Sequence, residues 1–137
     1  MKVYLTLLAG IWVSFNSPCA EIEKQEETPI LQKCLDNVDF GGMKNSQWLS
    51  CYTDEFYRQD KVLNNEYKKL ILRTPKTTHK QLVAGQRSWI KFREEWCAFE
   101  EKLPMAPNPF VNKAICFVEV TIEQINRIRN EFPLHNN

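Results

Sequence analysis

Apolar side chains recur at steps of three and four residues along most of this chain, a spacing that predicts amphipathic helices. The first long stretch runs from Ser46 to about Arg73 and ends before Pro75, because the residue that precedes a proline is disfavoured in helical geometry. The second long stretch starts at Thr78 and stops at Pro104. Its apolar seam is the most regular in the chain and comprises Leu82, Gly85, Trp89, Phe92, Trp96 and Phe99.

A third long helix is predicted from Pro109 to about Phe132, and a short one from Pro29 to about Asn37. The predicted N-caps are Thr28, Asn108 and Thr78, the last in a capping box with Gln81. No stretch shows the alternation of a strand. Three long helices with short connections predict an all-α, up-down-up antiparallel bundle, with the short N-terminal helix laid against it.

An apolar run, Val3–Val13, follows Lys2 and leads into a polar stretch that ends at Ala20. This layout is typical of a secretory signal peptide, and the run is too short to span a bilayer as a helix. We expect cleavage after Ala20; a lipoprotein signal with the anchor on Cys19 is the alternative. No other segment is expected to cross a membrane. The expected parts are the signal peptide 1–20, a flexible leader 21–28, a helical domain 29–133 and a tail 134–137.

Four cysteines remain after this cleavage: Cys34, Cys51, Cys97 and Cys116. An even number in a small exported chain predicts two disulfides and a periplasmic or secreted location. The cysteines are too widely spaced for a four-cysteine zinc site, which needs close pairs. All four lie near one end of the predicted bundle, so their positions along the bundle axis do not decide by themselves which cysteines pair. Cys34–Cys51 with Cys97–Cys116 is favoured because each bond closes a short loop, and Cys51–Cys97 with Cys34–Cys116 is the alternative.

The sequence offers no recognisable catalytic apparatus. His79 and His135 have no nucleophile or metal ligand at a useful spacing. Acidic pairs in the second long stretch fit a solvent-facing helix side better than a pair of catalytic carboxylates. Loss of Lys2 with the signal leaves cationic and anionic side chains balanced, which gives no electrostatic basis for binding nucleic acid or an anionic membrane. We therefore expect a protein-binding molecule without enzymatic activity, cofactor or metal.

The connection Leu103–Pro109 contains three prolines, which make it stiff. A rigid apolar loop loses little entropy on docking, which favours partner binding; the alternative is a plain helix-to-helix connector. The candidate contact residues are Leu103, Pro104, Met105, Pro107 and Asn108. The aromatic residues of the second seam could stack on a ligand, but their spacing fits a buried core better, since burial of each large side chain stabilises a small domain.

Several segments form one ordered pattern: Cys51-Tyr52, the stretch from Asp60 to Leu70, and Gln-Arg-x-Trp-x-x-x-Arg-x-x-x-Cys from Gln86 to Cys97, followed by Cys116 and a helix that contains Thr121. Together these segments resemble the LprI-like lysozyme-inhibitor N-terminal domain family. The resemblance extends from Cys34 to about Phe132. The motif positions carried over are Asp60, Leu63, Asn64, Tyr67, Gln86, Arg87, Trp89 and Arg93.

The resemblance implies an all-helical, exported bacterial envelope protein that binds and inhibits a lysozyme. Arg87 and Arg93 flank the seam, where we expect them to anchor neighbouring helices through carboxylates such as Asp60 or Glu66. One departure concerns Leu103–Pro109, since members of the family often carry a glycine-rich, serine-bearing connection there. The alternative function is an envelope structural or stress-interaction protein without an enzyme target.

Overall fold

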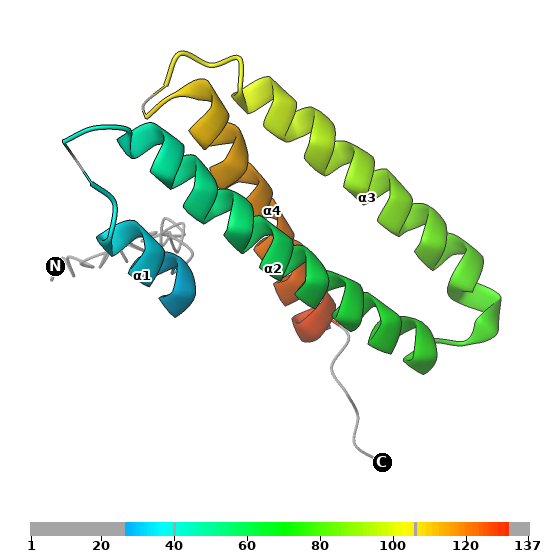
Figure 1. The fold of residues 1–137 in the computed structure, drawn as a ribbon. Helices are drawn as coiled ribbons and strands as arrows, with labels where there is room; N and C mark the ends of the chain where they lie inside the picture. Colours follow the sequence, from blue (N-terminus) through cyan, green and yellow to red (C-terminus); the bar gives the residue numbers. More distant parts are fainter. Residues whose placement is uncertain (1–26, 40, 106, 132–137) are drawn as a thin grey trace, which may run out of the picture.

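The computed structural model describes residues 27–39, 41–105 and 107–131, and the regular structure of these residues is entirely helical (Figure 1). The elements are α1 (Pro29–Asp36), α2 (Lys44–Arg73), the 3-10 turn η1 (Lys76–Thr78), α3 (His79–Glu100) and α4 (Pro109–Glu131). The all-α prediction of three long helices and a short N-terminal one is therefore confirmed. The predicted signal peptide, most of the leader and the C-terminal tail lie outside the described residues.

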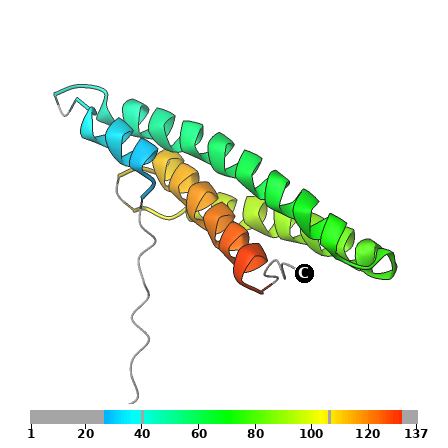
Figure 2. The ribbon, with the colours of Figure 1, turned by 90° about the horizontal axis from the view of Figure 1, so that it is seen from below.

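The three long helices alternate in direction, so that α2 and α4 run parallel and α3 runs antiparallel to both (Figure 1). The closest packing is between α2 and α4, and α3 also packs on α4. By contrast, α2 and α3 hardly meet, and α1 packs mainly on α2 (Figure 2). α4 is therefore the central helix, which packs on both α2 and α3.

Two apolar clusters hold these helices together. The larger joins α2 to α4 through Leu63, Leu70, Ile125 and Ile128, with Leu82 and Trp89 of α3 packed against it. The smaller joins α1 to α2 through Leu31, Val38 and Cys51. Burial of an aliphatic side chain of this size stabilises the fold by about 1.5–3 kcal/mol, so the larger cluster is the main energetic link between α2 and α4.

Two of the three predicted N-caps are confirmed. The Thr28 hydroxyl accepts from the Leu31 amide at the start of α1. The Asn108 side chain accepts from two amides in the first turn of α4. The capping box at Thr78 is wrong: this residue already has helical backbone angles at the end of η1, and its hydroxyl donates to the Pro75 carbonyl instead.

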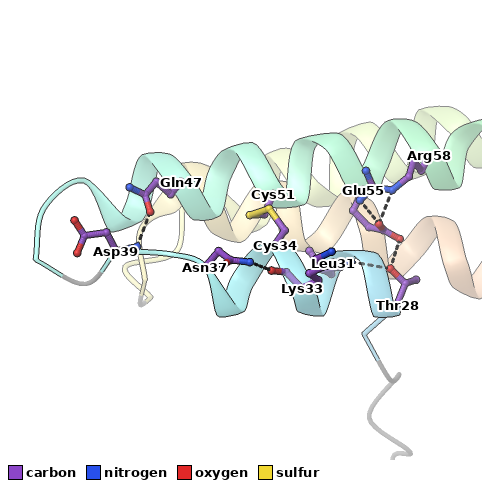
Figure 3. The surroundings of a disulfide bond; sticks show 10 residues. All are labelled: Thr28, Leu31, Lys33, Cys34, Asn37, Asp39, Gln47, Cys51, Glu55 and Arg58. Atoms are coloured by element: carbon purple, nitrogen blue, oxygen red, sulfur yellow. Dashed lines mark hydrogen bonds and ion pairs between the residues drawn. A yellow bond between two sulfur atoms is a disulfide. The ribbon is translucent and has the colours of Figure 1, made fainter.

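The two predicted disulfides are present, in the favoured pairing. Cys34–Cys51 ties α1 to α2 (Figure 3). Cys97–Cys116 ties α3 to α4. The alternative pairing is wrong because α1 lies along α2, which brings Cys34 directly opposite Cys51.

The prediction that the whole seam of α3 is buried is wrong. Phe92, Trp96 and Phe99 are about half exposed, at 50%, 46% and 52% of their surface. Leu82 and Trp89 on the same helix pack against the α2–α4 core. The difference arises because α3 packs closely on α4 alone, so only a narrow side of the helix is covered and the adjoining flank remains open.

Candidate partner-binding site

The α1–α2 and α3–α4 connections lie at the same end of the molecule (Figures 1 and 2). Large apolar side chains stand out from the surface here: Met43 is 75% exposed, Met105 54% and Phe110 65%. We call this region the tip and define it by Met43, Leu103, Pro104, Met105, Pro107, Asn108 and Phe110. Exposed apolar side chains that gather in one region mark a surface suited to binding another macromolecule.

The α3–α4 connection is held by specific contacts on both sides. The buried Asn112 amide donates to the Met105 carbonyl over 2.9 Å. Lys113 of α4 pairs with Glu101, just after α3, over 2.7 Å, and this hydrogen bond holds the pKa of the Glu101 carboxyl below its ordinary value. These contacts fix the backbone around Met105 without using its side chain, so the side chain is presented from a rigid support.

The predicted contact residues differ in how they are placed. Pro104 and Met105 are exposed, whereas Leu103 and Pro107 are partly buried. The Asn108 side chain is occupied as the N-cap of α4. Pro104 and Met105 are therefore the two members of the set that are most available to a partner.

The α1–α2 connection at the same end is also ordered by local hydrogen bonds. The Asp39 amide donates to the Gln47 side chain over 2.7 Å, and the Gly41 amide donates to the Asp39 carboxylate over 2.8 Å. Figure 3 shows how the first contact ties the chain that follows α1 to the start of α2. Met43, which precedes α2, is therefore exposed at the end of an ordered connection.

A groove of about 540 Å³ lies on one side of the tip, between α1, α2 and α4. Its walls are mainly apolar and comprise Leu35, Asp36, Trp48, Tyr52, Pro107, Val111 and Ile115. Burial and then the neighbouring Glu27 carboxylate raise the pKa of the Tyr52 hydroxyl to about 12. Tyr52 therefore stays neutral at physiological pH, and the groove keeps its apolar character.

A second groove, of about 430 Å³, lies on the other side of the tip, between α2 and α4 near the end of α3. It is lined by Leu49, Thr53, Phe56, Glu101, Phe110, Lys113, Ala114 and Phe117. The rings of Phe56 and Phe117 are 5.0 Å apart and form part of its wall. The tip therefore stands between two apolar hollows, both of which take residues from the first turns of α4.

Most residues of the sequence motif gather away from the tip, around Arg93. Its guanidinium lies 5.0 Å from the ring centres of Phe56 and Trp89 and 5.7 Å from that of Phe117. It donates to Asp60 over 2.9 Å and to the fully buried Thr121 hydroxyl over 3.0 Å. Arg93 of α3 thus contacts both α2 and α4, which gives the motif a structural role.

The other motif residues surround this contact. Asn64 donates to the second oxygen of Asp60 over 3.1 Å, and Gln86 accepts from Gln124 of α4 over 3.3 Å. Leu63 is buried in the main core, whereas Tyr67 is only partly buried. Arg87 is exposed, and Glu66 is bridged by Arg129 of α4 at 3.3 Å. The structure therefore brings Arg93, but not Arg87, to a carboxylate on another helix.

Sequence reasoning missed the role of Glu55, which is only 1% exposed. Burial alone would raise the pKa of its carboxyl, but hydrogen bonds from Gln59, Arg58 and Thr28 outweigh that effect and hold the pKa below its ordinary value (Figure 3). The Thr28 contact, at 2.9 Å, joins the cap of α1 to α2. The available signal was the position of Glu55 one turn after Cys51, on the apolar side of the helix.

Among residues 27–39, 41–105 and 107–131, no helix combines enough length with enough apolar character to cross a membrane. Within the same part of the chain, no three histidine, cysteine or acidic side chains come together in a group that could hold a metal ion.

No curated protein and no solved structure matches this chain significantly. A family model described as Lysozyme inhibitor LprI matches residues 41–127, which is more than half of the chain. The matched region includes α2, α3, most of α4 and the motif around Arg93. The chain therefore belongs to the lysozyme inhibitor LprI family.

Proposed function

We propose that this protein is exported to the periplasm or secreted, where it binds and inhibits a lysozyme without catalysing a reaction. Membership of the LprI family supports inhibition as the activity. The two disulfides favour an oxidising compartment, because thiols stay reduced in the cytosol. The enzyme could come from a host or from a competing bacterium.

The observation that carries this proposal is the exposed Met105 on a connection whose backbone is already fixed. A lysozyme binds a glycan strand in an elongated cleft, and a narrow rigid projection is the shape that can enter such a cleft. Because the connection is ordered before binding, little conformational entropy remains to be lost. We propose that Met105 is the anchor in the cleft, with Pro104 beside it and Met43 at its edge.

The test is a turbidity assay in which purified lysozymes digest a suspension of peptidoglycan in the presence of the protein. We expect inhibition at micromolar concentration. Met105→Asp places a charge at the proposed anchor and should raise the inhibition constant at least about tenfold, since a central apolar anchor contributes roughly 2 kcal/mol or more. Leu72→Asp is the matched control, because Leu72 is also apolar and is 85% exposed. It lies near the other end of α2 and should leave inhibition unchanged.

Several lysozymes of different origin should be included, because the proline-rich connection departs from the family pattern. Failure to inhibit any of them at micromolar excess would contradict the proposal. Equal inhibition by the Met105→Asp and wild-type proteins would leave the activity in place but contradict the tip as the binding surface. Affinity capture from envelope extract that returned a membrane assembly and no lytic enzyme would favour the structural alternative.

A further inference from the structure

We infer that two copies of this protein associate through α3, with their α3 helices antiparallel about a two-fold axis beside Phe92. The starting observation is the aromatic flank that the fold leaves open. The rings of Phe92 and Trp96 are 6.0 Å apart and those of Trp96 and Phe99 are 5.7 Å apart, so they form one continuous strip. Contiguous exposed rings of this kind are uncommon on surfaces that remain in water.

The strip lies on the side of α3 that is turned away from α4. Cys97 marks the α4 side, because it is bonded to Cys116. At 3.6 residues per turn, the three aromatic residues lie about 100–160° around the helix axis from Cys97. A second molecule can therefore reach them without displacing α4.

The same flank carries small residues one and two turns before the aromatic ones. Gly85 and Ser88 are both exposed, and a Cβ atom built on Gly85 would meet no atom within 4 Å. Glycine weakens a helix interior, and nothing within the described structure presses against this one. It lines a hollow of about 290 Å³ whose other walls include Leu70 of α2 and Gln124 of α4.

The large and small residues are placed symmetrically about Phe92. In an antiparallel pair centred there, Phe99 lies opposite Gly85 of the second copy, because each is seven residues from the centre. Trp96 and Ser88, each four residues from the centre, meet in the same way, and Phe92 meets its own equivalent. Each ring therefore faces either a hollow or another ring, and the surface is complementary to itself, as a two-fold interface requires.

The charges beside the strip fit the same arrangement. Lys91 and Glu95 are both exposed and lie next to each other on the solvent side of the strip, 3.7 Å apart. In the proposed pair, Glu95 of one copy comes within about 3 Å, measured along the helix axis, of the level of Lys91 in the other. The two-fold axis repeats this contact, so the interface gains two pairs of opposite charge. The two Lys91 residues are also about 3 Å apart in level, but each has the Glu95 carboxylate of its own copy beside it, 3.7 Å away, which offsets their repulsion. The match of large rings to small residues about Phe92 is therefore the reason for choosing a second copy as the occupant.

The strip from Gly85 to Phe99 is about 21 Å long and one helix wide, which is small for a protein interface. We therefore expect a reversible dimer that forms at roughly 100 μM and dissociates on dilution. Sedimentation velocity of the complete processed protein between 10 μM and 1 mM should show the mean mass rising from that of a monomer towards that of a dimer.

Three substitutions test the geometry. Phe92→Glu places two like charges at the axis and should keep the protein monomeric up to 1 mM, whereas Leu72→Glu, on another exposed surface, should leave the dimer intact. In Gly85→Leu the Cβ atom meets no neighbour within 4 Å and a poor helix former is replaced, so the substitution should raise the melting temperature while it abolishes the dimer. A higher melting temperature together with loss of the dimer would show that the interface is lost, whereas a damaged fold would lower the melting temperature.

Charge reversal tests the orientation of the pair. Lys91→Glu and Glu95→Lys should each weaken the dimer severalfold, and the double exchange should restore it. A wild-type protein that remains monomeric at 1 mM overturns the proposal, as does a dimer that survives Phe92→Glu. The wild-type protein could also remain monomeric while Phe92→Glu weakens its inhibition of lysozyme. That result would show that the enzyme covers the strip, and it would overturn the proposed dimer.

Discussion

Arg93 is the residue on which three helices converge. A guanidinium that is nearly buried needs compensation for its lost hydration, and Asp60, Thr121 and three aromatic rings supply it. Both hydrogen bonds come from Nη1, and the buried Nε has no hydrogen-bond partner, so the three rings supply an essential part of the compensation. Lysine does not replace arginine here, because an ammonium group lacks the planar surface that lies against the rings. The specific part of the family motif is thus explained by one buried cation.

We predict that Arg93→Lys lowers the free energy of unfolding by about 2 kcal/mol, since it keeps the charge but loses the stacking and one of the two hydrogen bonds. Urea denaturation followed by circular dichroism measures this. The matched control is Arg87→Lys in the same motif, which is exposed and should change the stability by less than about 0.5 kcal/mol. Equal effects of the two substitutions would refute the role assigned to Arg93.

The Glu55 carboxylate predicts a dependence of stability on pH. Its pKa is lowered in the folded protein, so its contribution is complete above the ordinary value, about 4.3, and is lost as the pH falls through the lowered folded value. Glu55→Gln should therefore cost about 1–2 kcal/mol at pH 7, and this difference should shrink as the pH falls through the lowered pKa of the folded carboxyl. Urea titrations of both proteins at pH 7 and at a series of acidic pH values measure the difference, and a constant difference would contradict this explanation.

At the scale of elements, α1 depends on few attachments. It packs mainly on α2, and Cys34–Cys51 together with the Thr28–Glu55 contact holds it there. A helix of this length is not stable alone in water. Its order therefore follows from the covalent bond and the small cluster around Leu31, rather than from its own propensity.

Replacement of Cys34 and Cys51 by serine should release α1 selectively. A disulfide that closes a loop of this length stabilises the folded state by about 3 kcal/mol. Hydrogen exchange should show the amides of α1 losing protection, while those in the α2–α4 core around Leu63 and Ile125 keep theirs. The Cys97→Ser/Cys116→Ser protein serves as the comparison, in which α3 should lose protection first. Loss of protection throughout both proteins would show that α1 is not a separate unit.

The elements themselves could be predicted from the sequence because helical spacing, prolines and caps are local signals. Thr28 and Asn108 satisfy their caps within one turn, so a short sequence window contains the necessary information. The capping box at Thr78 failed because Thr78 is itself the last residue of η1, so its backbone angles are already helical before α3 begins. The exposure of Phe92, Trp96 and Phe99 could not be predicted from the spacing of the apolar residues in α3. Spacing shows which residues share one face of a helix, but not whether another helix covers that face.

The candidate site was predictable to a smaller extent. The prolines of Leu103–Pro109 indicated a stiff connection, but Phe110 and Met43 join it only because the fold places two connections at one end. Similarly, Asp60 and Arg93 were predictable as partners from the resemblance, whereas Thr28 and Glu55 are 27 residues apart and meet only through the path of α1. Long-range contacts between polar residues leave little trace in one sequence.

At the scale of the molecule, the balance of charges predicts how inhibition responds to salt. The formal net charge of the whole chain is +1, and the proposed loss of Lys2 makes it zero. Without a net field, long-range attraction to a cationic lysozyme is weak. We predict that the inhibition constant changes less than about threefold between 50 and 300 mM sodium chloride. A much steeper loss of inhibition would indicate that ion pairs, rather than apolar tip contacts, dominate binding.

The way the α3–α4 connection is anchored has a consequence for specificity. Asn108 and Asn112 fix its path through caps and a main-chain carbonyl, so the fold does not depend on which side chains stand at positions 104 and 105. A library randomised at Pro104 and Met105 should therefore yield mostly folded variants. Selection from such a library against different cell-wall hydrolases could change the target while the rest of the sequence is left untouched.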